Sequence, residues 1–251
     1  MNKSKPGTLY GIGVGPGDPG LITLKASKVL NEVDVVFAAA SAKNSYSLAV
    51  SIAKPHIPET TLVKKLSFPM TRNKKETERA WKNNVRTIIK ELELGKDVAF
   101  LSLGDCMTYS TYGYILKHIR KSASHVNIKT IPGITSYQAA ASCLNVPLVE
   151  GEESLLIVSG ARGGDHLREL SVKPESVVFL KAYRNIEDID SALNESGLYN
   201  YSVGVLNCGL SEEEIVSNIK EFSKRQPNYW TLIIAKQKRN DSTKSSGEQD
   251  V

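Results

Sequence analysis

The sequence lacks the apolar run of roughly 18 residues that a membrane-spanning helix requires. It has few cysteines, and Cys106, Cys143 and Cys208 are too widely spaced for a zinc knot or a disulfide framework. Glycine and proline are not in excess, which excludes collagen-like and low-complexity chains. The basic stretch Met1–Lys5 is not followed by an apolar signal segment. We therefore expect a cytoplasmic protein that has no membrane partner and no metal centre.

The composition is typical of a folded globular protein, with 41% hydrophobic and 24% charged residues. Apolar runs alternate with helical patterns in both halves, which predicts parallel α/β sheets. We expect strands at 8–14, 34–38, 98–102, 126–131, 155–159, 176–180, 202–206 and 230–235. Helices are expected at 24–33, 75–94 and 211–222, the last with Ser211 as N-cap and Glu214 in a capping box. A boundary at Pro132–Gly133 gives two α/β domains, 1–132 and 133–236, and a polar tail, 237–251, expected to be disordered.

Positive charge is concentrated between Leu62 and Lys90, where nine basic and two acidic residues give a net charge of +7, against +5 for the whole chain. Five of these residues recur at helical spacing and share one helix face: Lys75, Arg79, Lys82, Arg86 and Lys90. A solvated helix face, a polyanionic ligand and a nucleic acid each account for such a pattern. The preceding segment, expected to be a loop, is the predicted point of contact with a polyanion through Lys64, Lys65, Arg72 and Lys74.

A glycine-rich turn follows the first expected strand, and its Gly15-Pro-Gly-Asp-Pro-Gly20 matches the G-x-G-x-x-G pattern of dinucleotide sites. Pro16 and Pro19 have no N–H to offer a phosphate, and no acidic residue ends the second strand to bind a ribose. The turn also lacks the Lys-Ser/Thr of a phosphate-binding P-loop. We therefore predict a tight strand-to-helix turn, with Thr23 as the N-cap of the helix that follows.

Two further turns follow expected strands. Leu103-Gly-Asp-Cys-Met-Thr-Tyr-Ser-Thr111 follows the strand at 98–102, and Pro132-Gly-Ile-Thr-Ser136 follows the strand at 126–131. Taken singly, Asp105, Thr135 and Ser136 have the residue types of helix caps. Taken together with the glycine-rich turn, they mark one sheet edge, and ligands of open α/β sheets collect at the carboxyl ends of strands.

These three motifs, in this order and with Tyr10-Gly-Ile-Gly-Val14 before the first turn, resemble the motif series of the tetrapyrrole methylase family over residues 7 to about 236. The form Gly-Asp-x-x-x-Tyr-Ser-Thr and the segment Ala80-Trp-Lys-Asn-Asn-Val85 are most similar to the branch that methylates C20 of precorrin-2 or cobalt-factor II in cobalamin biosynthesis. One residue departs from the pattern, because the family usually has proline after Gly-Asp and this chain has Cys106.

The resemblance implies two α/β domains with a cofactor cleft between them, as in class III S-adenosylmethionine methyltransferases, and a homodimer. It implies that S-adenosylmethionine is bound by Leu103, Gly104, Asp105, Thr108, Thr135, Ser136, Leu180, Cys208 and Thr231. The side of the cleft that receives the tetrapyrrole would be formed by Gly15, Pro16, Gly17 and Asp18. Asp105 is the candidate for orienting the cofactor, and no catalytic base is assigned.

The sequence therefore predicts methyl transfer from S-adenosylmethionine to C20 of a tetrapyrrole, with no nucleic-acid partner, and leaves open whether the substrate carries cobalt. One alternative is a methyltransferase of the same fold that acts on RNA ribose or on a modified protein residue, which the basic segment would suit. A second alternative is a nucleotide-binding oxidoreductase, against which the missing ribose carboxylate argues.

Overall fold

The structure is a computed structural model that describes residues 5–40, 47–69, 71, 73–198, 201–226 and 228–237. The chain forms two compact units, Met1–Ser136 and Tyr137–Val251, and each unit contains a five-stranded sheet. The tail expected to be disordered lies outside the described residues from position 238 onward. No helix in the described part of the chain is both long enough and apolar enough to cross a membrane.

The sheet of the first unit is parallel, and its strands lie in the order β3-β2-β4-β1-β5. The register aligns Ile12 of β1 with Leu101 of β4 and Ile131 of β5, so the carboxyl ends of these three neighbouring strands lie together. The strands span Thr8–Gly13 (β1), Val35–Ala40 (β2), Leu62–Ser67 (β3), Val98–Ser102 (β4) and Asn127–Ile131 (β5).

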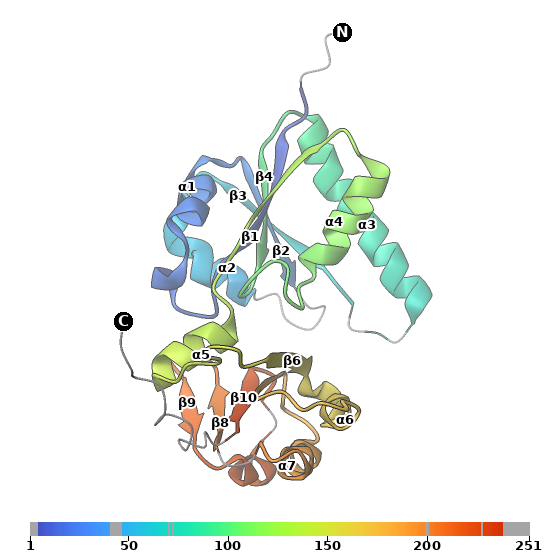
Figure 1. Ribbon diagram of the computed structural model, residues 1–251. Helices are drawn as coiled ribbons and strands as arrows, with labels where there is room; N and C mark the ends of the chain where they lie inside the picture. Colours follow the sequence, from blue (N-terminus) through green and yellow to red (C-terminus); the bar gives the residue numbers. More distant parts are fainter. Residues whose placement is uncertain are drawn as a thin grey trace, which may run out of the picture. The chain divides into compact units, whose positions relative to one another are not determined.

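Helices cover both faces of this sheet (Figure 1). Helices α1 (Leu24–Glu32) and α2 (Leu48–Ala53) pack on one face, and α3 (Lys74–Glu93) and α4 (Tyr112–Ser122) pack on the other. Because both faces are buried, the central strands are continuously apolar rather than alternating. Helix α3 has the predicted two faces, since Val85, Ile88 and Leu92 are buried while the basic residues at helical spacing are exposed.

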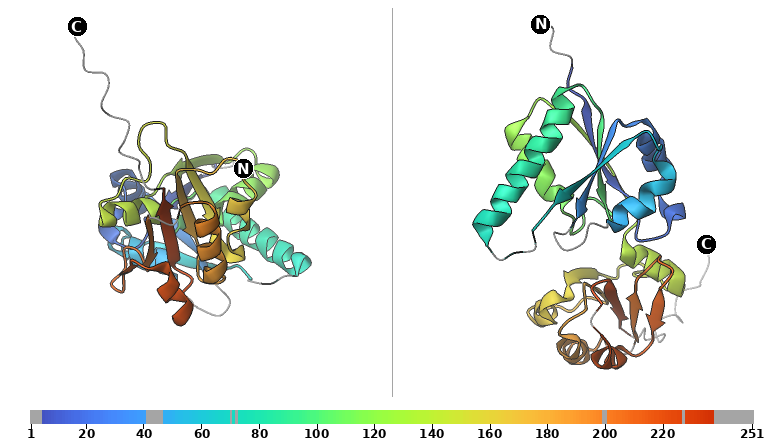
Figure 2. Two further views of the ribbon diagram at one scale, coloured as in Figure 1. Left: turned by 60° about the horizontal axis from the view of Figure 1, so that its bottom comes forward. Right: turned by 180° about the vertical axis from the view of Figure 1, so that it is seen from behind.

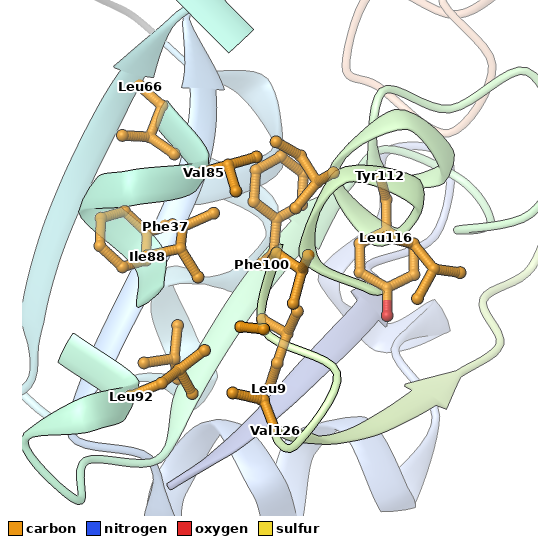
Figure 3. Close-up of a cluster of buried hydrophobic side chains, with 14 of the residues drawn as sticks. Leu9, Phe37, Leu66, Val85, Ile88, Leu92, Phe100, Tyr112, Leu116 and Val126 are labelled. Carbon is orange, nitrogen blue, oxygen red and sulfur yellow. The ribbon is translucent and has the colours of Figure 1, made fainter. Parts of the chain in front are cut away.

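The core beneath α3 and α4 is built around large side chains from β1, β2 and β4 (Figure 3). Phe100 and Tyr112 pack with their ring centroids 6.1 Å apart, and Phe37 is completely buried. The Tyr112 ring also lies against Gly11 of β1, where an added Cβ would come within 2.2 Å of the ring. The Tyr112 hydroxyl bonds to Thr130 of β5 at 3.1 Å, so its one polar atom is satisfied.

The sheet of the second unit is mixed and has the order β6-β7-β10-β8-β9 (Figure 2). The expected parallel pairing holds only for β6 with β7, and the other neighbours are antiparallel. Helices α6 (Asp165–Arg168) and α7 (Ile186–Glu195) pack on one face, and α5 (Ser136–Leu144) packs on the other. The strands span Leu155–Ser159 (β6), Ser176–Leu180 (β7), Tyr201–Leu206 (β8), Glu214–Val216 (β9) and Thr231–Lys236 (β10).

The helix predicted at 211–222 is wrong. Residues Glu214–Val216 form strand β9, which pairs with β8, and a 3-10 helix follows at Ile219–Lys224. The apolar residues of this segment fit a helical period, but Ile215 and Val216 are β-branched and suit a strand. Pairing with the neighbouring strand therefore overrides the capping signal of Ser211 and Glu214.

The loop predicted to hold Lys64 and Lys65 is also wrong, because both residues lie in edge strand β3. Lysines are common on edge strands, where their charge discourages pairing with another sheet. The Lys64 ammonium lies 2.5 Å from Glu91 of α3, and the Lys96 ammonium lies 2.7 Å from the other oxygen of that carboxylate. Lys64 therefore links the edge strand to the helix that covers it.

The Glu91 ion pairs predict how stability depends on pH. The hydrogen bond from Lys64, followed by that from Lys96, lowers the pKa of Glu91 from 4.5 to about 2. Because the folded-state pKa is the lower one, the stabilisation is fully present above pH 4.5 and is lost as the pH falls toward 2. We expect Glu91→Gln to lower the free energy of urea unfolding at neutral pH, by a difference that shrinks below pH 4.5.

The matched control is Glu93→Gln, because Glu93 is exposed on the same helix. This variant should unfold like the parent chain at every pH. A destabilisation by Glu91→Gln that does not change with pH would contradict an electrostatic role for Glu91.

Candidate functional site

The three turns that follow β1, β4 and β5 are joined directly to one another by hydrogen bonds. Gly15 and Gly104 form an antiparallel bridge, in which Gly15 N–H donates to Gly104 O at 3.2 Å and Gly104 N–H donates to Gly15 O at 2.8 Å. Both glycines have positive φ angles, +81° and +67°, which glycine adopts without steric cost. The glycine-rich turn and the Gly-Asp turn are therefore held at a fixed separation.

Asp105 connects the Gly-Asp turn to the third turn. Its Oδ2 accepts the Gly133 N–H at 3.0 Å, and its Oδ1 accepts the Met107 N–H of its own turn at 2.7 Å. The cap of helix α4 is Thr111, so Asp105 does not cap that helix. One carboxylate oxygen instead joins the turn after β4 to the turn after β5, and the other oxygen stabilises the turn that contains Asp105.

The close approach of these turns requires glycine at the contact points. A Cβ on Gly13 would lie 2.6 Å from Gly133 N, and a Cβ on Gly133 would lie 2.2 Å from Gly104 O. The sequence signal for this packing is Gly11-Ile-Gly13, two glycines on one side of β1, followed by Gly15 in the turn. The close approach at Gly13 was not predicted from the sequence.

The predicted tight turn between β1 and α1 is confirmed. Asp18 Oδ1 accepts the Gly20 N–H at 2.7 Å, a 3-10 turn spans Pro19–Leu21, and the Thr23 hydroxyl caps α1 by accepting the Ala26 N–H at 3.2 Å. The His56 ring bonds to Ser27 Oγ and Pro19 O, which holds the turn against the helix. Of the four residues predicted to face the substrate in this turn, Gly15, Pro16 and Gly17 are buried and Asp18 is exposed.

The segment after Asp105 has Cys106 where the motif usually has proline, and side-chain hydrogen bonds hold this segment in place. The Cys106 side chain is fully buried in the core, and that burial raises the pKa of its thiol to about 12. Ser110 Oγ donates to Ser102 Oγ at 2.9 Å and accepts the Tyr112 N–H at 3.1 Å, which ties the turn to the end of β4 and the start of α4. Tyr109 between them is exposed and has a φ of +49°.

The predicted cofactor residues of the first unit lie within these turns. Leu103, Gly104, Asp105 and Thr108 follow β4 and are partly buried, whereas Thr135 is buried and directly precedes α5. A Cβ added to Gly104 would lie 3.8 Å from Ile134 O and 3.9 Å from Thr135 Cα, with no closer neighbour. The Gly-Asp turn and the segment Ile134–Thr135 are therefore neighbours, at van der Waals distance from a Cβ at Gly104.

The second unit brings its three predicted cofactor residues to one edge of its sheet. Leu180 ends β7 and pairs with Leu232, Thr231 begins β10 and pairs with Leu206, and Cys208 follows β8 two residues later. The residues next to them, Lys181 and Asn207, have φ angles of +58° and +49°. Non-glycine residues in this conformation are uncommon and collect at functional sites.

Hydrogen bonds fix this second edge. Asn228 accepts the Trp230 N–H with its side chain at 2.9 Å and donates to Asn207 Oδ1 at 3.0 Å. The Thr231 hydroxyl donates to Asn228 O at 2.7 Å. Burial, followed by the negative charge of Glu213, raises the pKa of the Cys208 thiol to about 12, so this cysteine stays protonated. Its contribution to a ligand site would come from its backbone.

Two of the four basic residues predicted to meet a polyanion, Lys64 and Lys65, lie in strand β3. Lys64 is engaged with Glu91, and Lys65 is exposed on β3. Arg72 and the side chain of Lys74 lie outside the described part of the structure. On α3, a polar surface hollow is lined by Lys75, Arg79, Lys82 and Arg86 together with Glu78 and Asn83, and Lys82 pairs with Glu78 at 2.8 Å. Within the described residues, no group of three or more His, Cys, Asp or Glu is arranged to hold a metal ion.

Because Asp105 accepts two hydrogen bonds and Asp18 accepts one, we expect replacement by asparagine to destabilise the fold more at Asp105 than at Asp18. Asp105→Asn replaces one acceptor with an amide NH2 that faces a backbone N–H, so we expect a loss of about 1–3 kcal/mol in the free energy of unfolding. Asp18→Asn is the control, because Asp18 accepts one backbone bond and asparagine retains one acceptor. Urea unfolding of both variants tests this, and equal stabilities would show that the Asp105 bonds contribute little.

The glycine contacts predict opposite effects of the same substitution at two sites. Gly133→Ala forces a Cβ against Gly104 O and should destabilise the fold by about 1–3 kcal/mol. Gly113→Ala adds a Cβ that meets nothing within 4 Å at an exposed position of α4, and should stabilise it by about 0.5–1 kcal/mol. Thermal unfolding compares them, and a Gly133→Ala protein as stable as the parent would contradict the tight contact of the turns.

Two named relatives match nearly the whole chain. The cobalt-precorrin-2 C(20)-methyltransferase of Salmonella typhimurium is 30% identical over 233 residues, which cover 92% of this chain and 97% of the relative. The precorrin-2 C(20)-methyltransferase of Sinorhizobium sp. is 30% identical over 239 residues, which cover 91% and 94%. Each alignment therefore spans nearly the full length of both sequences.

Solved structures share the fold. A cobalt precorrin-4 methyltransferase aligns with a TM-score of 0.68 and 22% identity, covering 91% of this chain and 94% of that one. A uroporphyrin-III C-methyl transferase from Thermus thermophilus, complexed with S-adenyl homocysteine, aligns with a TM-score of 0.63 and 22% identity, covering 92% and 97%. The two-sheet α/β architecture is thus the one found in these methyltransferases.

The family model for Tetrapyrrole (Corrin/Porphyrin) Methylases matches residues 8–222, a span that includes all three interlocked turns and the end of β7. The expected series of motifs is therefore present in order and, within the first unit, in contact. On this match and the near-full-length relatives, the chain belongs to the tetrapyrrole methylase family.

Proposed function

We propose that this protein transfers the methyl group of S-adenosylmethionine to C20 of precorrin-2 or its cobalt-containing counterpart, in cobalamin biosynthesis. The observation that carries the proposal is the near-complete match to C20-methyltransferases, at 30% identity over 92% of the chain in the first of them. The interlocked turns support it, because they preserve the family's motif residues as one structural unit. The basic segment fits a substrate whose periphery is rich in carboxylates.

The residues at the two sheet edges fit S-adenosylmethionine. In the first unit we assign as contacts residues of two turns that lie next to each other: Leu103, Gly104, Asp105, Thr108, Thr135 and Ser136. In the second unit we assign Leu180, Cys208 and Thr231, whose edge is held by the hydrogen bonds of Asn228. Backbone groups would make most of these contacts, since the side chains of Asp105, Thr231 and Cys208 are already bonded or buried.

When bound, S-adenosylmethionine supplies a methyl group that is already activated by the positive sulfur. The work left to the chain is to orient the donor and to exclude water, and such positioning contributes on the order of 7–11 kcal/mol to lowering a barrier. The Asp105–Gly133 bond and the Gly15–Gly104 bridge suit this task, because they fix the backbone before any ligand arrives. We assign Asp105 as a positioning residue that acts through the two turns it joins.

The proton that leaves C20 after methylation needs an acceptor, and no side chain is assigned to that role. His56 is engaged with Ser27 and Pro19, and His118 lies beside Trp81 with ring centroids 6.1 Å apart. Asp18 is the exposed acidic group of the glycine-rich turn, on the side we propose for the substrate together with Gly15, Pro16 and Gly17. We also propose that the active form is a homodimer, on the resemblance to the family alone.

The test is methyl transfer with a labelled donor. The protein is incubated with S-adenosylmethionine carrying a 13C methyl group and with either precorrin-2 or cobalt-factor II. We expect mass spectrometry to detect the gain of one labelled methyl group and NMR to place it on C20. Comparing the two substrates also decides whether the preferred one carries cobalt. The Gly113→Ala variant is the control for losses of activity during preparation, because its added Cβ meets nothing within 4 Å and the variant should remain active.

Two results would contradict the proposal. A label on another tetrapyrrole carbon would assign the protein to a different branch of the family. A label found on RNA ribose or on protein, with none on either tetrapyrrole, would favour the alternative methyltransferase. Light scattering of the purified protein tests the homodimer separately, and a monomer that turns over at the full rate would exclude it.

A further inference from the structure

An exposed group of aromatic rings and cations lies at the ligand edge of the second sheet. It consists of Tyr183, Tyr229 and Trp230 with Lys181 and Arg184, and we call it the aromatic–cation cluster. The ring centroids of Tyr183 and Tyr229 are 5.3 Å apart, and those of Tyr229 and Trp230 are 5.1 Å apart. Tyr229 is 38% exposed and Trp230 is 43% exposed, so the core does not need them for packing.

Both cations lie over these rings. The Lys181 ammonium is 5.8 Å from the Tyr229 ring centroid, and the Arg184 guanidinium carbon is 5.0 Å from the Tyr183 ring centroid. Two positive charges are thereby kept at the rim of an apolar surface. Isolated apolar residues on a surface need no explanation, but a contiguous patch rimmed by charge marks a binding site.

The fold builds this cluster at a defined place. Tyr183 follows β7 and Tyr229 precedes β10, and the Ala182 N–H donates to Thr231 O at 2.9 Å, which holds the two segments side by side. Asn228 accepts the Trp230 N–H and thereby shapes the turn that presents both exposed rings. Leu180 and Thr231, the neighbours of the cluster, are residues we assign to the cofactor.

We propose that the aromatic–cation cluster binds the tetrapyrrole substrate, with its rings against the macrocycle and Lys181 and Arg184 paired with peripheral carboxylates. This proposal rests on the proposed function and adds the part of the second unit that recognises the substrate. A macrocycle that is large, apolar and rimmed by carboxylates matches aromatic rings rimmed by cations. The adenine of the cofactor would use the rings, but it carries no carboxylate to match the positive charges beside them.

Three variants test the cluster by kinetics: Tyr229→Leu, Trp230→Leu and Arg184→Gln. We expect each to raise KM for the tetrapyrrole by about tenfold, the effect of losing one good contact, while calorimetry gives an unchanged Kd for S-adenosylhomocysteine. Tyr201→Leu is the aromatic control, because Tyr201 is 37% exposed at the opposite edge of the same sheet. Arg120→Gln is the charge control, because Arg120 is exposed in the last turn of α4. Both controls should keep the parental KM.

Fluorescence tests binding without turnover. The chain has two tryptophans, so a Trp81→Phe variant leaves Trp230 as the only indole. We expect a stable porphyrin with eight carboxylates to quench Trp230 emission in a saturable manner that Arg184→Gln weakens and Arg120→Gln does not. A Kd for S-adenosylhomocysteine that rises in the cluster variants, with the tetrapyrrole KM unchanged, would assign the cluster to the cofactor and overturn the proposal.

The remaining outcomes separate the cluster from the proposed function. Quenching by single-stranded RNA that is tighter than quenching by the porphyrin would overturn the proposal in favour of a nucleic-acid surface. Methyl transfer to C20 with a parental KM in all three variants would overturn the cluster and leave the proposed function intact. Porphyrin quenching that needs Arg184, in a protein that methylates no tetrapyrrole, would support the cluster and refute the proposed function.

Discussion

The structure of the first unit depends on one local constraint, the joining of three strand ends through Gly15, Gly104, Asp105 and Gly133. A parallel sheet places the carboxyl ends of its strands at one edge, but the connections that leave that edge are ordinarily separate loops. Here a pair of backbone hydrogen bonds and one carboxylate tie them together. The contacts between the turns are so close that a methyl group at Gly13 or Gly133 would overlap the neighbouring backbone. This edge of the sheet is therefore held together by hydrogen bonds and close packing, as the sheet behind it is.

A rigid edge suits chemistry in which the reagent is already activated. Methyl transfer from a sulfonium needs alignment more than it needs acid, base or metal, and a backbone fixed in advance loses little entropy when a ligand binds. The second unit reaches a similar result by other means. Its edge has side-chain amides in place of close glycines, with Asn228 linking Asn207 to the turn before β10. Rings and cations then lie exposed beside that edge.

Much of this could be predicted from the sequence where burial alone decides the structure. Strands β4, β6 and β7 begin and end at the predicted residues, because each is a short apolar run between polar turns. Helix α3 and its two faces follow from spacing in the same way. Edge strands β3 and β9 were missed because Lys64, Lys65 and Glu214 interrupt the apolar pattern, and only pairing with a neighbour makes these segments strands.

The residues of the three turns could be singled out from the sequence, but the contacts between the turns could not. The resemblance identified Asp105 and the three turns, whereas the bond from Gly133 N–H to Asp105 depends on the register of β1 between β4 and β5. The aromatic–cation cluster has no signal in the sequence, because Tyr183 and Tyr229 become neighbours only when β7 pairs with β10. Long-range strand pairing is the information that local patterns lack.

Amide hydrogen exchange, resolved by residue and measured with and without S-adenosylhomocysteine, tests the central claim most directly. If the three turns form a rigid edge before the cofactor binds, the Gly15, Gly104 and Gly133 amides are strongly protected in the free protein, and the ligand changes their exchange little. The amides around Leu103 and Thr135 should then gain protection on binding. Rapid exchange of the three glycine amides in the free protein, with protection only after the ligand is added, would contradict the account, because the cofactor would then be assembling the edge.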